Sequence, residues 1–475
     1  MSAHRLRVGF FGLLAQGNLG NDGSLEAMLA FVRDRHPGAD IDVLCPRPEE
    51  IARRYGLRAT RLHWNRREYE TARGVGAIAR KIFGKLADPV RVAAWVRDHD
   101  IVFVPGMGVL ESVPPLRPWG FPYSLFLVSA AGRLQRTWVG MISVGADRSV
   151  SPMTRWVVGK AAKMAAYRSF RDAPARDALQ SMGVDTSRDS VYADLVFALP
   201  NPEPPQAPTG VVGLGVMDYH GGYADRGRTD EVHAAYIATI TRFADWLLDE
   251  GWRVRVLIGD QGDVPAARAV VDAVRANRPD VAETAITAAA PADLAGVQQE
   301  IAQVDVVVAT RFHNVICALK QAKPTISLAY AAKNDVLMRA FGLGDYCQPL
   351  GSLDVERLIE QFRLLQKSQD ELVGKMQAQA AANADRLNEQ FDILADTLFR
   401  SSLPAVIAAD AEGKLDENRE RKHNAVRSPA RGYLAASAFS ICGSSSAFAE
   451  SAVSGPTCLK AILPSLPTTK VSGTP

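Results

Sequence analysis

The chain has 475 residues, of which 47% are hydrophobic and 23% are charged, a composition ordinary for a soluble globular protein. This length is too great for one small core, so we expect two domains and an additional segment. The 55 basic and 52 acidic residues leave a formal net charge of +3. That near balance argues against a dedicated nucleic-acid-binding protein.

The five cysteines are too few and too scattered for a disulfide framework. Cys45, Cys317 and Cys347 stand in apolar segments and are interpreted as core residues in a reducing compartment. The spacing of cysteines and histidines indicates no metal site. The N-terminus enters a predicted strand directly, and no apolar run reaches the roughly 18 residues of a membrane span. We therefore expect neither a signal peptide nor a transmembrane segment.

The first part of the chain alternates short apolar runs with helical patterns. Between the first two runs, apolar residues recur over residues 25–32 at the spacing of one helix face. Strands that alternate with helices predict a parallel sheet covered on both faces. The runs with the composition of buried strands are residues 6–14, 41–45, 100–106 and 137–145.

The pattern stops at residues 199–210, which contain five prolines, and then restarts. We interpret this segment as a linker. Helical patterns cover residues 234–251 and 353–399, and strands are predicted at residues 211–217, 253–259, 305–310 and 325–330. The fold class predicted is α/β, with two Rossmann-like domains facing a cleft. The predicted bounds are 1–200 for the first domain, 201–210 for the linker and 211–400 for the second domain with its terminal helices.

The last residues differ in composition from the rest. Residues 412–431 are a charged run, and residues 432–451 are apolar, small and serine-rich, similar in pattern to a secretory signal peptide in the wrong place. We predict a disordered tail over residues 401–475. Weak contact with a membrane or a partner is the alternative.

An arginine and a histidine stand where the predicted strand 305–310 ends. Arg311 and His313 are followed by residues compatible with a helix. Ligands of an open parallel sheet bind beyond the carboxyl ends of its strands, where helix N-termini also favour anions. A guanidinium suits a phosphate or carboxylate, and a histidine transfers protons near neutral pH. The alternative, an arginine paired with a structural carboxylate and a histidine filling a turn, is equally open here.

A polar, glycine-containing loop follows the first predicted strand and includes Asn18, Gly20, Asn21 and Asp22. Glycines let a ligand approach the backbone, and Asn or Asp side chains cap the helix that follows. The spacing is not that of a dinucleotide-binding motif. A ligand-binding loop and a tight turn with a helix cap both remain open.

Arg171 follows another short strand-like run and precedes a helix predicted to begin near Pro174. A second anion contact is one interpretation of this residue. A surface arginine that flanks a helix is the commoner case.

Four segments in this order resemble the polysaccharide pyruvyl transferase family: GNLGNDGSLEAML, DIVFVPGMG, RDAPARDALQSMG and ATRFHNVICALKQAKPTISLAYAAK. The last segment is the most specific of the four. Their order and spacing hold over residues 6–400. Residues 105–108 depart from the glycine run of the family, which bears on acceptor binding, and the tail has no counterpart.

The resemblance implies a glycosyltransferase-B-like fold and an enzyme of polysaccharide biosynthesis. It implies phosphoenolpyruvate as donor substrate, no cofactor, and a sugar of a surface polysaccharide, such as an exopolysaccharide, or its lipid-linked precursor as acceptor. The location expected is the cytoplasm, including the inner face of the membrane with peripheral association. The family's arginine and histidine map onto Arg311 and His313, and a donor-binding arginine maps onto Arg171.

In the mechanism expected from this resemblance, His313 is the general acid or the proton shuttle. Asp22 orients or deprotonates the sugar hydroxyl, with helix capping as its competing role. Asn18, Gly20 and Asn21 are expected to bind substrate. The catalytic prediction thus consists of His313, Arg311 and Asp22.

Two other functions stay open from the sequence. A nucleotide-sugar glycosyltransferase shares the expected fold, and its ligand would be a nucleoside diphosphate sugar. A non-catalytic binding or scaffold protein that retains the fold is the second.

Overall fold

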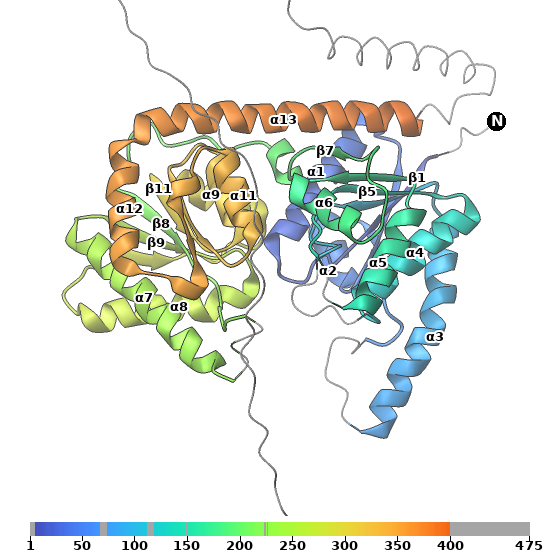
Figure 1. The fold of residues 1–475 in the computed structure, drawn as a ribbon, viewed down its shortest axis with the longest axis horizontal. Coiled ribbons are helices and arrows are strands. Elements are labelled where there is room, and N and C mark those ends of the chain that lie inside the picture. The colour runs from blue at the N-terminus through green and yellow to red at the C-terminus, as the bar shows by residue number, and fades with distance from the viewer. Residues whose placement is uncertain are drawn as a thin grey trace, which may run out of the picture. The chain divides into compact units, whose positions relative to one another are not determined.

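A computed structural model describes residues 5–66, 74–111, 118–148, 151–222, 225 and 227–399. These residues belong to one compact unit that spans residues 1–408. The unit contains two separate parallel sheets with helices packed against them (Figure 1).

The first sheet has seven strands in the order β3-β2-β1-β4-β5-β6-β7, and each neighbouring pair is parallel. The chain reverses its direction of winding between β1 and β4. Ligands of such sheets bind beyond the carboxyl ends of the strands, near this switch point. The strands are β1 (Arg7–Phe11), β2 (Asp40–Cys45), β3 (Arg58–Arg61), β4 (Ile101–Pro105), β5 (Trp138–Val144), β6 (Tyr167–Phe170) and β7 (Ser190–Val191).

The second sheet repeats this plan with six parallel strands in the order β10-β9-β8-β11-β12-β13. Its switch point lies between β8 and β11, directly before Arg311. The strands are β8 (Val211–Gly215), β9 (Arg253–Leu257), β10 (Ile286–Ala288), β11 (Val306–Ala309), β12 (Thr325–Ala329) and β13 (Cys347–Pro349).

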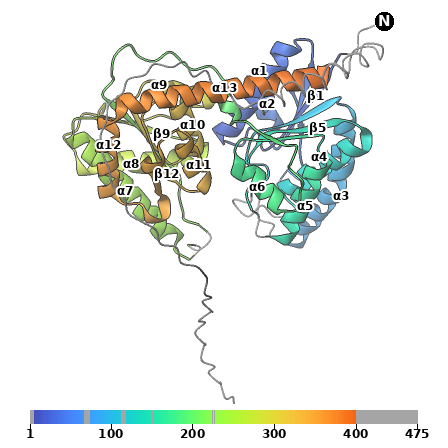
Figure 2. The same cartoon turned by 45° about the horizontal axis from the view of Figure 1, so that its top comes forward.

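Helices connect most consecutive strands, because parallel strands need a long crossover. In both views α3, α4 and α5 lie side by side (Figures 1 and 2). The helices of the first part are α1 (Leu19–Arg35), α2 (Pro48–Tyr55), α3 (Val75–Arg97), α4 (Phe121–Gln135), α5 (Pro152–Met164), α6 (Ala173–Ser181) and the 3₁₀ helix η1 (Leu195–Ala198).

The second part begins with α7, which takes in most of the helix predicted over residues 234–251. The predicted helical stretch 353–399 is divided between α12 and α13. The helices are α7 (Thr229–Asp249), η3 (Gln261–Asp263), α8 (Val264–Asn277), α9 (Leu294–Ala302), α10 (Phe312–Lys320), α11 (Ala332–Ala340), η4 (Gly344–Tyr346), η5 (Leu350–Ser352), α12 (Val355–Lys367) and α13 (Gln369–Phe399).

The strands predicted from continuous apolar runs are all present, and the predicted α/β class with two Rossmann-like sheets is confirmed. The apolar-run analysis did not identify β3, β7, β10 and β13. All four are edge strands of two to four residues. An edge strand is covered less completely than a central one, so it needs no continuous apolar run.

The predicted linker carries no helix or strand over residues 200–210. The strands of the two sheets lie on either side of it, within residues 7–191 and 211–349. The single compact unit joins both sheets, so the domain bounds stay a prediction. The predicted disordered tail, residues 401–475, lies outside the described residues. Within the described part of the chain, no helix is long and apolar enough to span a membrane.

The last helix, α13, returns from the second part of the chain to the first sheet. Phe391 stacks on Phe31 of α1 with ring centroids 4.8 Å apart. Gln390 is fully buried, accepts a hydrogen bond from Ser143 Oγ at 3.0 Å and donates one to Ser169 Oγ at 2.6 Å. These contacts make α13 a bridge between the two parts of the chain.

We predict that Gln390→Ala destabilises the protein by about 1–3 kcal/mol, because Ser143 and Ser169 lose their buried partner. Asp392→Ala is the matched control on the same helix, since its ion pair with Arg35 is exposed and should contribute no more than ~1 kcal/mol. Chemical unfolding of both variants measures the difference. Equal losses would show that the buried amide does not contribute specifically.

Candidate active site

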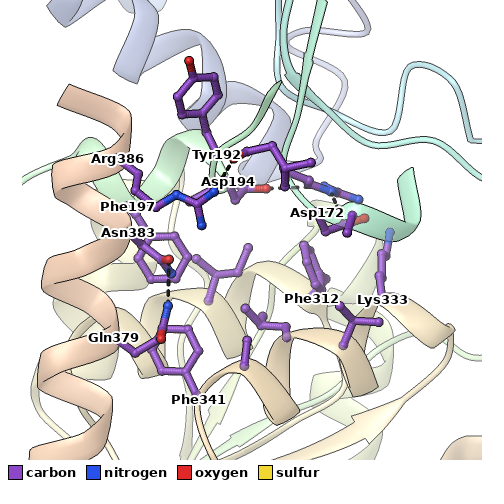
Figure 3. Close-up of a pocket in the computed structure, with 18 residues that line it drawn as sticks. Asp172, Tyr192, Asp194, Phe197, Phe312, Lys333, Phe341, Gln379, Asn383 and Arg386 are labelled. Carbon is purple, nitrogen blue, oxygen red and sulfur yellow. Dashed lines mark hydrogen bonds and ion pairs between the residues drawn. The ribbon is translucent and has the colours of Figure 1, made fainter. Parts of the chain in front are cut away.

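A cavity of about 200 Å³ lies where residues from the two parts of the chain meet (Figure 3). Arg171 and Asp172 enter it from the end of β6, and Asp194 from the segment before η1. Phe312 and Lys333 enter it from the first turns of α10 and α11, which follow β11 and β12. The site therefore lies beyond the carboxyl ends of strands of both sheets, as open parallel sheets favour.

Arg171 is the most deeply buried charged group of the cavity, with a side chain only 3% exposed. It forms ion pairs with Glu111 and, at 3.4 Å, with Asp194. Its guanidinium also lies 4.8 Å from the ring centroid of Phe312 in the second part of the chain. Burial alone would lower the pKa of Arg171, but the neighbouring carboxylates raise it, so the side chain stays charged. The surface-arginine interpretation of the sequence is therefore wrong.

Lys333 brings a second cation to the same carboxylate. Its ammonium lies 3.0 Å from Glu111 Oε2 and 5.1 Å from the ring centroid of Phe312. Burial acts to raise the pKa of Glu111, but Arg171 and Lys333 hold it below the ordinary value. Glu111 is thus an anion shared by two cations, one from each part of the chain.

His313 lies in the first turn of α10 with its side chain 13% exposed. Its Nε2 atom is 3.9 Å from Asp194 Oδ2 and has no hydrogen-bond partner among the described residues. Burial lowers the pKa of His313 to about 4, with Arg171 and Lys333 acting in the same direction against Asp194. The imidazole is therefore neutral at pH 7 and keeps one ring nitrogen able to accept a proton.

Gly20 is the residue of the N-terminal loop that approaches His313 most directly. It lies in the first turn of α1, and a Cβ atom built on it would stand 1.9 Å from His313 Nδ1. No side chain fits in that space. The absence of one at position 20 lets the imidazole from the second part of the chain pack against α1.

Asn18 and Asn21 hold the beginning of α1. Asn18 is the N-cap, and its side chain accepts a hydrogen bond from the Asn21 N–H at 3.1 Å. The Asn21 amide donates to the Leu13 carbonyl at 3.2 Å. The Leu19 N–H also donates to the carbonyl of Gly259, which follows β9. The helix cap that the sequence left open is present, and Asn18 provides it. Contacts of Asn18, Gly20 and Asn21 with substrate stay predictions.

Asp22 is fully buried in the first turn of α1, where it accepts a hydrogen bond from Ala15 N–H at 2.7 Å. Arg54 of α2 contacts its other oxygen at 3.1 Å. Burial raises the pKa of Asp22 to about 6. These contacts fix the loop before α1, whereas deprotonation of a substrate by Asp22 stays a prediction.

Arg311 occupies the N-cap position of α10. Its Nε and Nη2 atoms donate to the two oxygens of the fully buried Asp263, at 2.8 and 2.5 Å. This bidentate pair is the arrangement that the sequence left open as the alternative to an anion site. With 24% of the side chain exposed, a direct role of Arg311 toward substrate stays a prediction.

Lys333, Glu111 and Asp194 were not singled out from the sequence. The sequence does contain a signal for Lys333, because this residue is the last one of the segment ATRFHNVICALKQAKPTISLAYAAK, which carries the family resemblance. Glu111 and Asp194 are single acids in loops after β4 and β7, and no spacing rule separates them from surface acids. Their role follows only from their contacts with Arg171.

One group in the described part of the chain has the residue types of a metal site: Asp218, His220 and His233. The two imidazoles stack with centroids 4.5 Å apart and an interplanar angle of 11°. Asp218 Oδ1 lies 3.1 Å from His220 Nε2, which makes it a hydrogen-bond partner. One potential ligand atom from each of the three side chains lies within 4.8 Å of the others, and the expectation of no metal site stays a prediction.

Comparison with solved structures identifies proteins of the same fold. A putative UDP-N-acetylglucosamine 2-epimerase from Listeria monocytogenes gives a TM-score of 0.53 at 12% identity, covering 84% of this chain and 97% of that one. UDP-GlcNAc 2-epimerase from Neisseria meningitidis, bound to UDP-GlcNAc, gives 0.51 at 11% identity, covering 84% and 100%. Such low identities establish the shared glycosyltransferase-B-like fold alone.

The family comparison covers part of the candidate site, and Lys333 lies just beyond the matched residues. No curated protein matches the sequence. The model of the polysaccharide pyruvyl transferase family matches residues 18–331, more than half of the chain. This span includes Gly20, Glu111, Arg171, Asp194 and His313, which meet around the cavity or contact its residues. The chain therefore belongs to the polysaccharide pyruvyl transferase family and is a transferase.

Proposed function

We propose that this transferase moves the pyruvyl group of phosphoenolpyruvate onto a sugar of a surface polysaccharide or of its lipid-linked precursor, forming a ketal. The observation that carries the proposal is the pair of cations, Arg171 and Lys333, that line one small cavity, with His313 beside it at 3.9 Å from the lining residue Asp194. Phosphoenolpyruvate carries a carboxylate and a phosphate on a three-carbon frame. Two cations brought together by one carboxylate suit such a doubly anionic ligand.

The donor binds by competing with Glu111 for Arg171 and Lys333. Both cations already lie in low-dielectric surroundings, so the donor need not pay for their desolvation again. The N-terminus of α10 also opens toward this region, through Phe312, and no side chain caps it. The N–H groups of its first turn add to the attraction for an anion.

Ketal formation requires a proton at the methylene carbon of the donor, and this makes C2 electrophilic. A sugar hydroxyl attacks C2, a second hydroxyl of the same sugar closes the ring, and phosphate leaves. The two hydroxyls release two protons. One of them replaces the proton that the methylene carbon takes up to become a methyl group, and the other leaves with phosphate or solvent. Neutral His313 accepts a hydroxyl proton and passes it on, which makes it a proton shuttle.

The size of the cavity favours this donor over a nucleotide sugar. Sites for drug-sized ligands usually enclose about 300–1,000 Å³. The cavity of about 200 Å³ is smaller and fits a three-carbon phosphate. Because the fold is shared with proteins that bind UDP and UDP-sugars, the nucleotide-sugar alternative is the one to test against.

The direct test is incubation of the protein with labelled phosphoenolpyruvate and a panel of nitrophenyl or lipid-linked sugars. We expect label in the sugar product, released as pyruvate by mild acid. Thermal shifts measured with phosphoenolpyruvate, UDP and GDP separate the donors. A shift with a nucleotide and none with phosphoenolpyruvate would exclude the proposal.

Replacing Lys333 by Met should weaken donor binding about 10- to 150-fold, because one charge-assisted contact contributes about 1.5–3 kcal/mol. Titration calorimetry with phosphoenolpyruvate gives the affinity. Lys160→Met is the matched control, since Lys160 is exposed on α5. An unchanged affinity of the folded Lys333→Met protein would remove Lys333 from the donor site.

His313→Gln should retain donor affinity and lower turnover by roughly 10²–10⁴-fold, the usual contribution of general acid–base catalysis. Glutamine keeps a hydrogen-bonding side chain of similar length but carries no transferable proton near neutral pH. The measurement is kcat beside the calorimetric affinity for phosphoenolpyruvate. Full turnover in this variant would end the proton-shuttle assignment.

His313 should also give stability a defined pH dependence. Its folded pKa of about 4 lies below the ordinary value of 6.5, so the folded state binds fewer protons than the unfolded state between these values. The corresponding stability is present above pH 6.5 and is lost as the pH falls toward 4. From pH 7 to pH 5 the wild type should lose roughly 2 kcal/mol more than His313→Gln in urea unfolding. Parallel pH profiles would contradict a buried neutral imidazole.

Gly20→Ala should displace the His313 imidazole, since the new Cβ would stand 1.9 Å from Nδ1. We expect turnover to fall by at least about tenfold, because a misplaced proton-transfer group is inefficient. Gly38→Ala is the control, because no heavy atom lies within 4 Å of a Cβ built there. Wild-type turnover in Gly20→Ala would show that the contact does not position the imidazole.

A further inference from the structure

The cavity has two ends that differ in chemistry (Figure 3). Lys333 lies at the charged end, to which the donor is assigned. Two amides of α13, Gln379 and Asn383, form the other end. The rings of Phe197 and Phe341 lie beside these amides. Because amides are neutral, this end offers hydrogen bonds without the positive charge that attracts an anion.

The two amides bind each other and keep polar groups for a ligand. Gln379 Nε2 donates to Asn383 Oδ1 at 3.0 Å, across one turn of α13. Within the described part of the chain, Gln379 Oε1 and Asn383 Nδ2 form no hydrogen bond. Asn383 is only 7% exposed and lines the cavity. Polar groups buried to this extent normally have hydrogen-bond partners, so a partner is expected within the cavity.

A sugar suits the amide end better than the donor does. Gln379 Oε1 accepts a hydrogen bond and Asn383 Nδ2 donates one, and a sugar hydroxyl can do both. Phosphoenolpyruvate presents acceptor oxygens, which cannot pair with Gln379 Oε1. The rings of Phe197 and Phe341, stacked with centroids 5.8 Å apart, give the same end an apolar wall for the C–H groups of a sugar ring.

The amide end also reaches the surface of the protein. Arg386 of α13 lines the cavity and is exposed, and its guanidinium donates to the Val191 carbonyl. A sugar that belongs to a polysaccharide or to a lipid-linked precursor brings a large molecule with it, most of which must stay outside. The small donor has no such requirement. The end beside α13 is therefore the one at which a sugar can enter.

We propose that Gln379 and Asn383 form the acceptor subsite and hold hydroxyl groups of the reacting sugar. This inference rests on the proposed pyruvyl transfer and adds the residues that select the acceptor. Asp194 lies between the two ends in Figure 3, and His313 Nε2 is 3.9 Å from it. A sugar hydroxyl held by the amides would thus meet the donor beside the proton shuttle. Helix α13, which bridges the two parts of the chain, then also binds substrate.

The test is the double variant Gln379→Ala/Asn383→Ala, assayed with labelled phosphoenolpyruvate and the nitrophenyl sugar that the wild type uses fastest. We expect the KM for the sugar to rise about 5- to 150-fold, because two hydrogen bonds to neutral hydroxyls are lost. The calorimetric affinity for phosphoenolpyruvate should stay unchanged, since the amides do not contact the donor. Alanine is a strong helix former, so α13 should be retained, as circular dichroism can verify.

Gln377→Ala/Asn388→Ala is the matched control, because it removes the same two residue types from exposed positions of α13 outside the cavity lining. It should keep the wild-type KM for the sugar. An unchanged KM in the cavity variant would overturn the inference, because only water would then meet the amides. Weaker donor binding without a change in this KM would also overturn it, since the amides would serve the donor.

The wild-type assay separates this inference from the proposed function. If the wild type transfers pyruvyl groups and the cavity variant keeps its KM for the sugar, only the acceptor subsite is rejected. If the wild type transfers none to any sugar of the panel, the proposed function fails and the acceptor subsite fails with it.

Discussion

The ion pairs of Glu111, whose side chain is 16% exposed, are the interactions on which the site depends. Glu111 lies between Arg171, which follows β6 of the first sheet, and Lys333, which follows β12 of the second. Two cations cannot be held in the same low-dielectric region without an anion, since their repulsion and desolvation would both be unfavourable. Glu111 therefore allows the sheets to bring positive charge to one cavity. Gly145 makes room for the ion pair between Glu111 and Arg171, because a Cβ atom at position 145 would lie 2.6 Å from Glu111 Oε1 and from Arg171 Nη2.

The second constraint is the contact between His313 and α1. The histidine is placed by β11 and α10, but the wall behind its ring is Gly20 of the first part of the chain. The loop before α1 is held by Asn18 and Asp22, so its polar residues act on the site through the position of the helix. A residue two contacts away from the chemistry can thus control it, because close-packed side chains transmit displacements.

The sequence predicts the central strands well, because they are buried on both faces and read as continuous apolar runs. The placement of His313 beyond the end of β11 also follows from the sequence, and the comparison confirms the family that the motifs indicate. Pairing of Arg311 with Asp263 could not be predicted, since 48 residues separate the two and only the strand order β9-β8-β11 brings them together.

The charges around His313 connect donor binding to proton transfer. In the free protein, burial and the cations Arg171 and Lys333 keep the imidazole neutral, with Asp194 acting in the opposite direction. The proposed donor would place additional negative charge beside the same cations and weaken their effect on the ring. The pKa of His313 should therefore rise when the donor binds, so that the ring, neutral in the free site, becomes able to hold a proton released by the attacking hydroxyl. The same groups then bind the donor and set the protonation state that the transfer needs.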